Sequence, residues 1–265
     1  MSAAGADDPR ARAVRREWVR RTRRHPSRTQ HDYLHLRRLL DDLSRALADL
    51  ALPAAPDVLD LYCGARPYDD LLPPGARVVS LDVVDEYGVA DIVSSAFLPF
   101  EDHRFDLVLC TQALYYAPDP ATAVAEIGRI LRPGGVLVAT VPHVQEYARA
   151  TRERRFTGPE LHHLFSSWED VEVVESGNRA VTWTTITGRI LLDLERASSR
   201  GPASARAMRI AGPAMHVVLN TAGVLLERLD RRIAKPGHAL PCALLVSARS
   251  PVAAAAREHP PRPSG

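Results

Sequence analysis

The sequence lacks the features that define several common protein classes. Only three of its 265 residues are cysteine, and Cys63, Cys110 and Cys242 lie far apart in the chain. This number and spacing exclude a disulfide framework and a zinc site, so we expect no metal centre. The polar, basic N-terminus contains no apolar core of the kind that signal peptides carry. We therefore expect a reducing, cytoplasmic setting.

Neither sign of charge is in large excess, since the formal net charge is only +2. Its distribution is uneven, because residues 1–30 hold nine arginines against three acids, a net of +6 that leaves −4 on the rest of the chain. A basic segment of this kind can contact nucleic acid or an anionic membrane. Its low apolar content favours a solvated, disordered arm over residues 1–30.

Short apolar runs alternate with helical patterns through much of the chain. Leucines at helical spacing predict a first helix over about residues 31–50, and further helices are predicted over 118–131 and 160–166. The runs that predict strands are residues 58–62, 77–83, 91–95, 105–110, 136–141, 171–176 and 243–249. This alternation predicts an α/β fold with a mostly parallel sheet that helices cover on both faces.

The segment before the last predicted strand has a different character. From about residue 181 to 233 the pattern is helical, with interruptions near Pro202 and Pro213. Residues 210–226 are apolar, but the run is shorter and more mixed than a membrane span of about 20 residues. We expect a lid or packing helix there, with an interfacial helix that meets lipid-linked substrates as the alternative. The tail from Pro251 is predicted to be disordered.

Glycine is scarce where a nucleotide-binding loop would stand. The strand at 58–62 runs into a turn and a predicted helix, in the sequence VLDLYCGARPYDDLL, and only Gly64 is a glycine there. The dinucleotide fingerprint G-x-G-x-x-G is therefore missing, which disfavours a nicotinamide dehydrogenase. Gly64 would still let the backbone approach a ligand, and Pro67 suits the first turn of the following helix. Asp82 ends the next strand, where an acid can accept hydrogen bonds from ribose hydroxyls.

Four motifs in register over residues 57–142 resemble the class I S-adenosylmethionine-dependent methyltransferases with a type 11 core. The first motif of that family reads approximately LD-x-G-C-G-x-G and appears here as LDLYCGAR, followed by Pro67 and Tyr68 as in a bacterial subset. The acid at the end of the second strand is the second motif. LPFEDHRFD at residues 98–106 and LRPGGVL at residues 131–137 are similar to two further family segments.

The resemblance implies a Rossmann-like, mostly parallel seven-stranded sheet and S-adenosylmethionine as the cofactor. The loop at 62–66 would pass under the methionine portion, Asp60 would orient its amino group, and Asp82 would hold the ribose with Val83 beside the adenine. Ser94, Ser95 and Ala96 would line the adenine edge, with Gln112 near the cofactor. The implied cofactor contacts are Asp60, Tyr62, Gly64, Arg66, Asp82, Val83, Ser94, Ser95, Ala96 and Gln112.

The resemblance also implies a domain organisation. A methyltransferase domain is expected over residues 31–250, with its cofactor-binding half at 57–142. A helical insertion on the substrate side, over about residues 143–235, would precede the last strand. The predicted arm and tail flank this domain.

Three positions depart from the family pattern. Tyr62 and Arg66 replace glycines, and a side chain there costs on the order of 1 kcal/mol if the φ angle is positive. Arg66 would offset this by pairing with the cofactor's carboxylate. Ser94 stands where many members have an adenine-binding aspartate, and a hydroxyl binds more weakly than a carboxylate. These departures keep open a non-catalytic interaction module with the same fold.

His143 is the candidate general base. It follows the fifth predicted strand at the carboxyl edge of the sheet, and histidine titrates near neutrality. A base is needed only if the nucleophile arrives protonated, so His143 could equally just line or cap its loop. Weaker candidates are Tyr115, Tyr116, His162 and His163.

The resemblance leaves the methyl acceptor open. A small-molecule, glycan or lipid-linked acceptor is favoured, with peripheral membrane contact as a possibility for the last. An RNA acceptor gripped by the Arg-rich segment is the alternative. Nucleic acid is disfavoured, because CTQALYY at residues 110–116 contains neither an Asn-Pro-Pro-Tyr nor a Pro-Cys motif.

Overall fold

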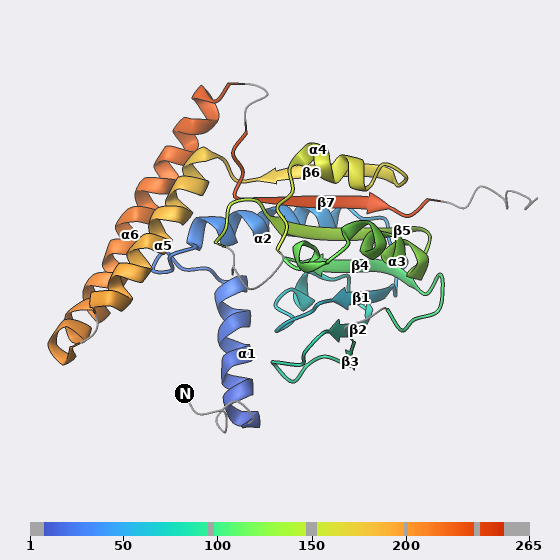
Figure 1. Cartoon of the computed structure of the whole chain (residues 1–265), viewed down its shortest axis with the longest axis horizontal. Helices are drawn as coiled ribbons and strands as arrows, with labels where there is room; N and C mark the ends of the chain where they lie inside the picture. The colour runs from blue at the N-terminus through green and yellow to red at the C-terminus, as the bar shows by residue number, and fades with distance from the viewer. Residues whose placement is uncertain (1–7, 95–97, 147–152, 199–200, 236–238, 252–265) are drawn as a thin grey trace, which may run out of the picture.

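The computed structural model describes residues 8–94, 98–146, 153–198, 201–235 and 239–251. Its centre is a seven-stranded sheet in the order β3-β2-β1-β4-β5-β7-β6 (Figure 1). The strands are β1 Asp57–Leu61, β2 Arg77–Asp82, β3 Ile92–Val93, β4 Phe105–Thr111, β5 Leu131–Pro142, β6 Glu169–Ser176 and β7 Ala243–Arg249. Only β7 runs antiparallel to its neighbours. The predicted mostly parallel sheet of seven strands is confirmed.

Helices cover both faces of the sheet, as the sequence predicted. The helices are α1 Pro9–Arg24, α2 Tyr33–Ala48, α3 Pro120–Ile130, α4 Gly158–Leu164, α5 Arg179–Ser198 and α6 Pro202–Ile233. Two short 3-10 turns, η2 Asp69–Leu71 and η3 Leu114–Tyr116, follow β1 and β4. In Figure 1 α2 lies on one face, and α3 and α4 lie on the other. The hairpin of α5 and α6 forms the helical insertion before β7.

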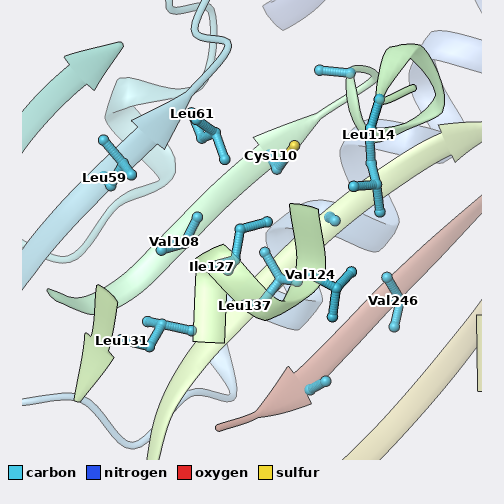
Figure 2. Close-up of a cluster of buried hydrophobic side chains, with 14 of the residues drawn as sticks. Leu59, Leu61, Val108, Cys110, Leu114, Val124, Ile127, Leu131, Leu137 and Val246 are labelled. Carbon is cyan, nitrogen blue, oxygen red and sulfur yellow. The ribbon is translucent and has the colours of Figure 1, made fainter. Parts of the chain in front are cut away.

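Two apolar layers hold these helices to the sheet. On one face, Leu43 and Leu47 of α2 pack against buried side chains of β4 and β5 such as Leu109 and Val138. On the other face, Val124 and Ile127 of α3 pack over the same two strands, as Figure 2 shows. Full burial of such a side chain contributes about 1.5–3 kcal/mol, so the leucine and valine periodicity of the sequence is what positions the sheet.

The segment after β1 differs from the prediction. We expected an α-helix beginning near Pro67, but the chain makes only the single 3-10 turn η2 before it enters β2. Helix α2 occupies the face that such a helix would cover, and Tyr68 and Leu72 are buried against the same cluster as its leucines. The N-terminal helix thus supplies the packing, and the loop after β1 stays short.

The predicted disordered arm is also wrong over the part that the structure describes. Residues Pro9–Arg24 form α1, whose N-cap Asp8 accepts a hydrogen bond from the Arg10 amide at 2.9 Å. Arg20 Nε donates to the Ala65 carbonyl at 2.7 Å, and Arg24 forms an ion pair with Asp70. Composition suggested solvation, but specific carbonyl and carboxylate partners after β1 hold these arginines.

The insertion is a helical hairpin, α5 and α6, that stands beyond the carboxyl ends of the parallel strands (Figure 1). The predicted break near Pro202 is present, since α6 begins there, but Pro213 lies inside α6 and does not interrupt it. A close approach of the two helices depends on Gly223, where an added Cβ would lie 2.5 Å from Thr184 Oγ1. Of the predicted disordered tail, residues 252–265 lie outside the described residues.

Candidate active site

The loop after β1 has an unusual backbone. Tyr62, Gly64 and Arg66 all have left-handed φ angles, of 58°, 52° and 52°. A Cβ added to Gly64 would meet no atom within 4 Å, so open space lies beside this backbone. The two side-chain-bearing residues each cost on the order of 1 kcal/mol in this conformation. The loop is therefore strained and leaves open space beside Gly64 at the carboxyl end of β1.

Asp82 anchors this loop from the end of β2. Its Oδ2 accepts a hydrogen bond from the Gly64 amide at 2.8 Å, and its Oδ1 accepts one from the Val83 amide at 2.7 Å. A carboxylate has about four lone-pair positions, so two acceptor positions remain for a ligand. This leaves Asp82 able to accept hydrogen bonds from a ribose while it holds the loop.

Asp60 belongs to β1, lies near enough to Asp82 of β2 for their charges to interact, and is almost entirely buried. Burial, with the nearby negative charges of Asp69 and Asp82, raises the pKa of Asp60 to about 8, although Arg66 opposes the shift. Near neutral pH this carboxyl group is therefore mostly protonated. A cationic ligand group placed beside it would favour the ionised form. This is the chemistry expected of a group that orients a ligand's ammonium.

The remaining predicted cofactor residues lie around these two acids. Val83 is exposed directly after Asp82, and the Ser94 amide donates to the Asp82 carbonyl at 3.0 Å. Gln112, with a φ of 53°, follows β4 and donates through its amide to Thr140 Oγ1 at 2.9 Å. Arg66 Nε donates to Asp69 Oδ1 at 3.2 Å. Ser95 and Ala96 lie outside the described residues.

A cavity of about 770 Å³ opens beside Gln112, over the carboxyl ends of β4 and β5. Its size is that of a typical small-molecule site. Its walls come from α1, α2, α5 and the segments after β4 and β5. The lining residues are Arg23, His31, Asp32, His35, Leu36, Gln112, Pro142, Val144, Gln145, Glu146, Thr185, Ile186, Arg189, Ile190 and Cys242. The sequence analysis identified only Gln112 among them.

His35 is the most unusual group in this cavity. It is half-buried, and its buried Nδ1 has no hydrogen-bond partner among the residues that the structure describes. Burial alone would lower the pKa of His35, but the neighbouring Cys242 thiol outweighs burial and raises it. Burial would raise the pKa of Cys242, yet His35 and a hydrogen bond with Thr185 lower it. The only sequence signal was the four-residue spacing of His31 and His35, which places two histidines on one side of a helix start.

His143 directly follows β5 at the carboxyl edge of the sheet, as predicted, but its side chain faces the segment before α4. Its Nδ1 lies 2.9 Å from the Phe156 carbonyl oxygen, and its amide donates to the Cys242 carbonyl at 3.0 Å. Because a carbonyl only accepts, Nδ1 carries the proton, and Nε2 has a free lone pair when the ring is neutral. His143 therefore ties the segment before α4 to β7, and it is not among the residues that line the cavity.

The weaker candidates are also absent from the cavity lining. Tyr115 is buried and stacks on the exposed Tyr116, with ring centroids 4.0 Å apart. Burial, followed by the hydrogen bond to Tyr116, raises the pKa of Tyr115, which makes this phenol a poorer base at neutral pH. His162 and His163 are exposed on α4.

Residues 59–139, which include β1, the strained loop, Asp82 and most of β5, match the family model of a methyltransferase domain. This segment is thus similar to the methyltransferase-domain family. The predicted resemblance is thereby confirmed over the cofactor-binding half of the chain.

Relatives of known sequence match about a third of the chain. A demethylmenaquinone methyltransferase of Lactiplantibacillus plantarum is 35% identical over 115 residues, which are 36% of this chain and 48% of that protein. Phthiotriol/phenolphthiotriol dimycocerosates methyltransferase 1 of Mycobacterium ulcerans is 35% identical over 96 residues, 36% of this chain and 34% of that protein. The chain thus spans less than half the length of these relatives.

Solved structures share the fold at low sequence identity. A complex of the Haloferax volcanii Trm112 methyltransferase activator with its methyltransferase partner matches with a TM-score of 0.51 and 20% identity, over 92% of this chain and 97% of that one. The [4+2]-cyclase SpnF matches with a TM-score of 0.51 and 21% identity, over 80% of this chain and 81% of that one. Since one neighbour is a cyclase, the fold by itself does not determine the reaction.

Proposed function

We propose that the methyltransferase domain transfers the methyl group of S-adenosylmethionine to a small-molecule, glycan or lipid-linked acceptor bound in the cavity beside Gln112. The observation that carries the proposal is the position of this cavity. It adjoins the carboxyl ends of β4 and β5, and its lining includes Gln112, one of the implied cofactor contacts. Ligands of open α/β sheets bind at this edge.

The residues present fit the cofactor. The space beside Gly64 admits a ligand close to the backbone, Asp82 has free acceptor positions for ribose hydroxyls, and Asp60 is a buried acid suited to an ammonium group. The cofactor supplies a methyl group already activated on a sulfonium. The protein then contributes alignment of the acceptor and exclusion of water.

A protonated acceptor requires a group that takes up its proton. We propose His35 for this role, because it lines the cavity and its buried Nδ1 is unpartnered among the described residues. The earlier prediction for His143 stays a prediction, and its free Nε2 is the property that would support it. A test that separates the two histidines follows in the Discussion.

The RNA alternative has less support than the small-acceptor proposal. It requires arginines near the N-terminus that are available to phosphates. Several of them are engaged within the protein, since Arg20 binds the Ala65 carbonyl and Arg24 pairs with Asp70. Arg15 also pairs with Glu86 at 3.1 Å. These arginines would have to give up their contacts within the protein to bind phosphates, which would weaken RNA binding.

Calorimetric titration with S-adenosylmethionine and S-adenosylhomocysteine tests the cofactor site. We expect binding that Asp82→Ala weakens by about 1.5–3 kcal/mol, the usual worth of a hydrogen bond to a charged group. Asp102→Ala, which removes an exposed acid paired with Arg129, serves as the matched control. No binding by the folded wild-type protein would favour the non-catalytic module, and an unchanged affinity of Asp82→Ala would refute the site assignment.

The acceptor class is then tested with radiolabelled cofactor. Lipid, glycan and small-metabolite fractions are offered separately, and RNA is offered as a fourth substrate. Labelling of RNA alone would refute the proposed acceptor class.

A further inference from the structure

The outer face of α6 is apolar and largely uncovered. We define the α6 stripe as five of its exposed large apolar side chains, Ile210, Val217, Val218, Leu225 and Leu226; Leu229 and Ile233 nearer its end are exposed as well. Ile210 and Val218 are 76% and 70% exposed. Helix α6 contains residues Ser204–Ile233, a segment long and apolar enough to cross a membrane by length and composition alone. Such a surface is unusual on a soluble protein and indicates an interaction site.

The opposite face of α6 is tied to the rest of the protein by buried polar groups. Asn220 Nδ2 donates to the carbonyls of Arg28 and Gln30, both at 2.8 Å. Glu227 is 2% exposed and forms an ion pair with Arg38. Pulling α6 away would leave these groups buried without partners in lipid, at several kcal/mol each. The helix is therefore built to lie on a surface and not to cross it.

The charges of α6 point to the nature of that surface. Its only acids, Glu227 and Asp230, are both buried, whereas all of its described arginine side chains are exposed. The arginines lie on either side of the apolar stripe, at positions 206, 209, 228, 231 and 232. A second copy of this face would bring like charges together. An anionic lipid surface would accept the apolar side chains and attract the flanking arginines.

The active-site cavity opens toward the same hairpin. Ile186 and Ile190 of α5 line the cavity, and both are also exposed, Ile190 by 62%. Trp183 and Leu194 extend this exposed apolar face along α5 at helical spacing. Exposed apolar side chains of the hairpin thus reach the cavity mouth at Ile186 and Ile190.

We propose that the α5–α6 hairpin docks on an anionic lipid bilayer through the α6 stripe and its flanking arginines. The docking does not rest on the proposed methyl transfer. Amphipathic helices with apolar and basic surfaces bind membrane interfaces through apolar burial plus attraction to anionic lipids. Because the stripe and the cavity mouth belong to one hairpin, docking would hold the active site near the bilayer.

Co-sedimentation of the full chain with lipid vesicles tests this surface. One set of vesicles contains phosphatidylcholine alone, and the other contains equal parts of phosphatidylcholine and phosphatidylglycerol. We expect binding to the anionic vesicles that falls as salt is added, because salt screens the arginines. Equal binding to both vesicle types, or binding to neither, would overturn the proposal.

Variants locate the contact on the protein. Val218→Glu is expected to lower the partition coefficient by about tenfold or more, because it removes an inserted apolar group and adds a repelled charge. Val93→Glu is the matched control, since Val93 is 58% exposed on the edge strand β3, outside the hairpin. Replacing Arg228 by Gln is expected to lower binding about fivefold.

Other outcomes count against the lipid surface. Ile210→Glu repeats the test at a second exposed position, should Val218→Glu fail to fold by circular dichroism. Unchanged binding of a folded stripe variant would overturn the assignment. A dimer in light scattering that Val218→Glu dissociates would show that a second copy covers the stripe instead. The assay contains no cofactor or acceptor, so its failure and a failure of methyl transfer are separate results.

Discussion

Replacement of Asp60 by asparagine should stabilise the protein at neutral pH and weaken cofactor binding. The Asp60 carboxyl is 4% exposed, and burial followed by the charges of Asp69 and Asp82 raises its pKa from 3.8 to about 8. An acid with a raised pKa binds more protons in the folded state than in the unfolded chain. Its presence therefore makes the free energy of unfolding fall as the pH rises between these two pKa values.

The magnitude follows from the size of the shift. One pKa unit corresponds to 1.36 kcal/mol, so at pH 7 the raised pKa of Asp60 lowers the free energy of unfolding by about 4 kcal/mol. This value is an upper limit, because water can enter a strained loop. Asparagine has nearly the same shape and no charge. We expect Asp60→Asn to be more stable than wild type by up to about 4 kcal/mol at pH 7, with the difference shrinking toward pH 4.

Urea unfolding at several pH values between 4 and 9 measures this difference. Asp102→Asn serves as the control, because its exposed ion pair with Arg129 is expected to contribute little. A pH-independent difference between Asp60→Asn and wild type would refute the argument from burial.

The same residue links cofactor binding to pH. Pairing with the cofactor's ammonium requires the ionised carboxylate, so binding at pH 7 should release a proton from Asp60 and strengthen as the pH rises toward 8. Calorimetry in two buffers with different ionisation enthalpies detects that proton. Asp60→Asn should bind more weakly and release no proton from this site, and proton release equal to that of wild type would contradict the assignment.

Two further predictions concern the active-site histidines and the hairpin. If His35 takes the acceptor's proton, His35→Gln should lower turnover by about 10²–10⁴-fold without loss of cofactor affinity. His143→Ala should instead disturb the segment before α4. A full loss of turnover in His143→Ala alone, with a flattened pH profile, would assign the base to His143. Gly223→Ala should lower the free energy of unfolding by about 1–3 kcal/mol, since the added methyl meets Thr184 Oγ1 at 2.5 Å; thermal unfolding tests this, and an unchanged midpoint would show that α5 and α6 separate easily.

Local patterns in the sequence were sufficient for the sheet and the cofactor loop. Strand periodicity depends on side chains a few residues apart, so most strands were predicted close to their observed bounds and β7 at both ends, whereas β5 begins at Leu131, five residues before its predicted start. The positive φ at Tyr62 and Arg66 was anticipated because the glycines that they replace mark such positions. Asp82 was identified by its place at the end of a strand, and the structure adds that it anchors Gly64.

Other features depend on contacts between distant parts of the chain. The arginines of α1 looked like a solvated arm, because composition cannot show that carbonyls and acids of the loop after β1 receive them. The helix expected near Pro67 does not form, since α2 already covers that face of the sheet.

The acceptor cavity shows most clearly which features depend on the local sequence and which depend on contacts between distant segments. The sequence by itself determined the strands of the cofactor half and the residues at its loop, because motif spacing along one strand and turn is local. Only the tertiary structure brought His35 of α2, Thr185 of α5 and Cys242 before β7 to one cavity. The pKa shifts of His35 and Cys242 arise from burial and from their interaction with each other, which exist only when distant segments pack together.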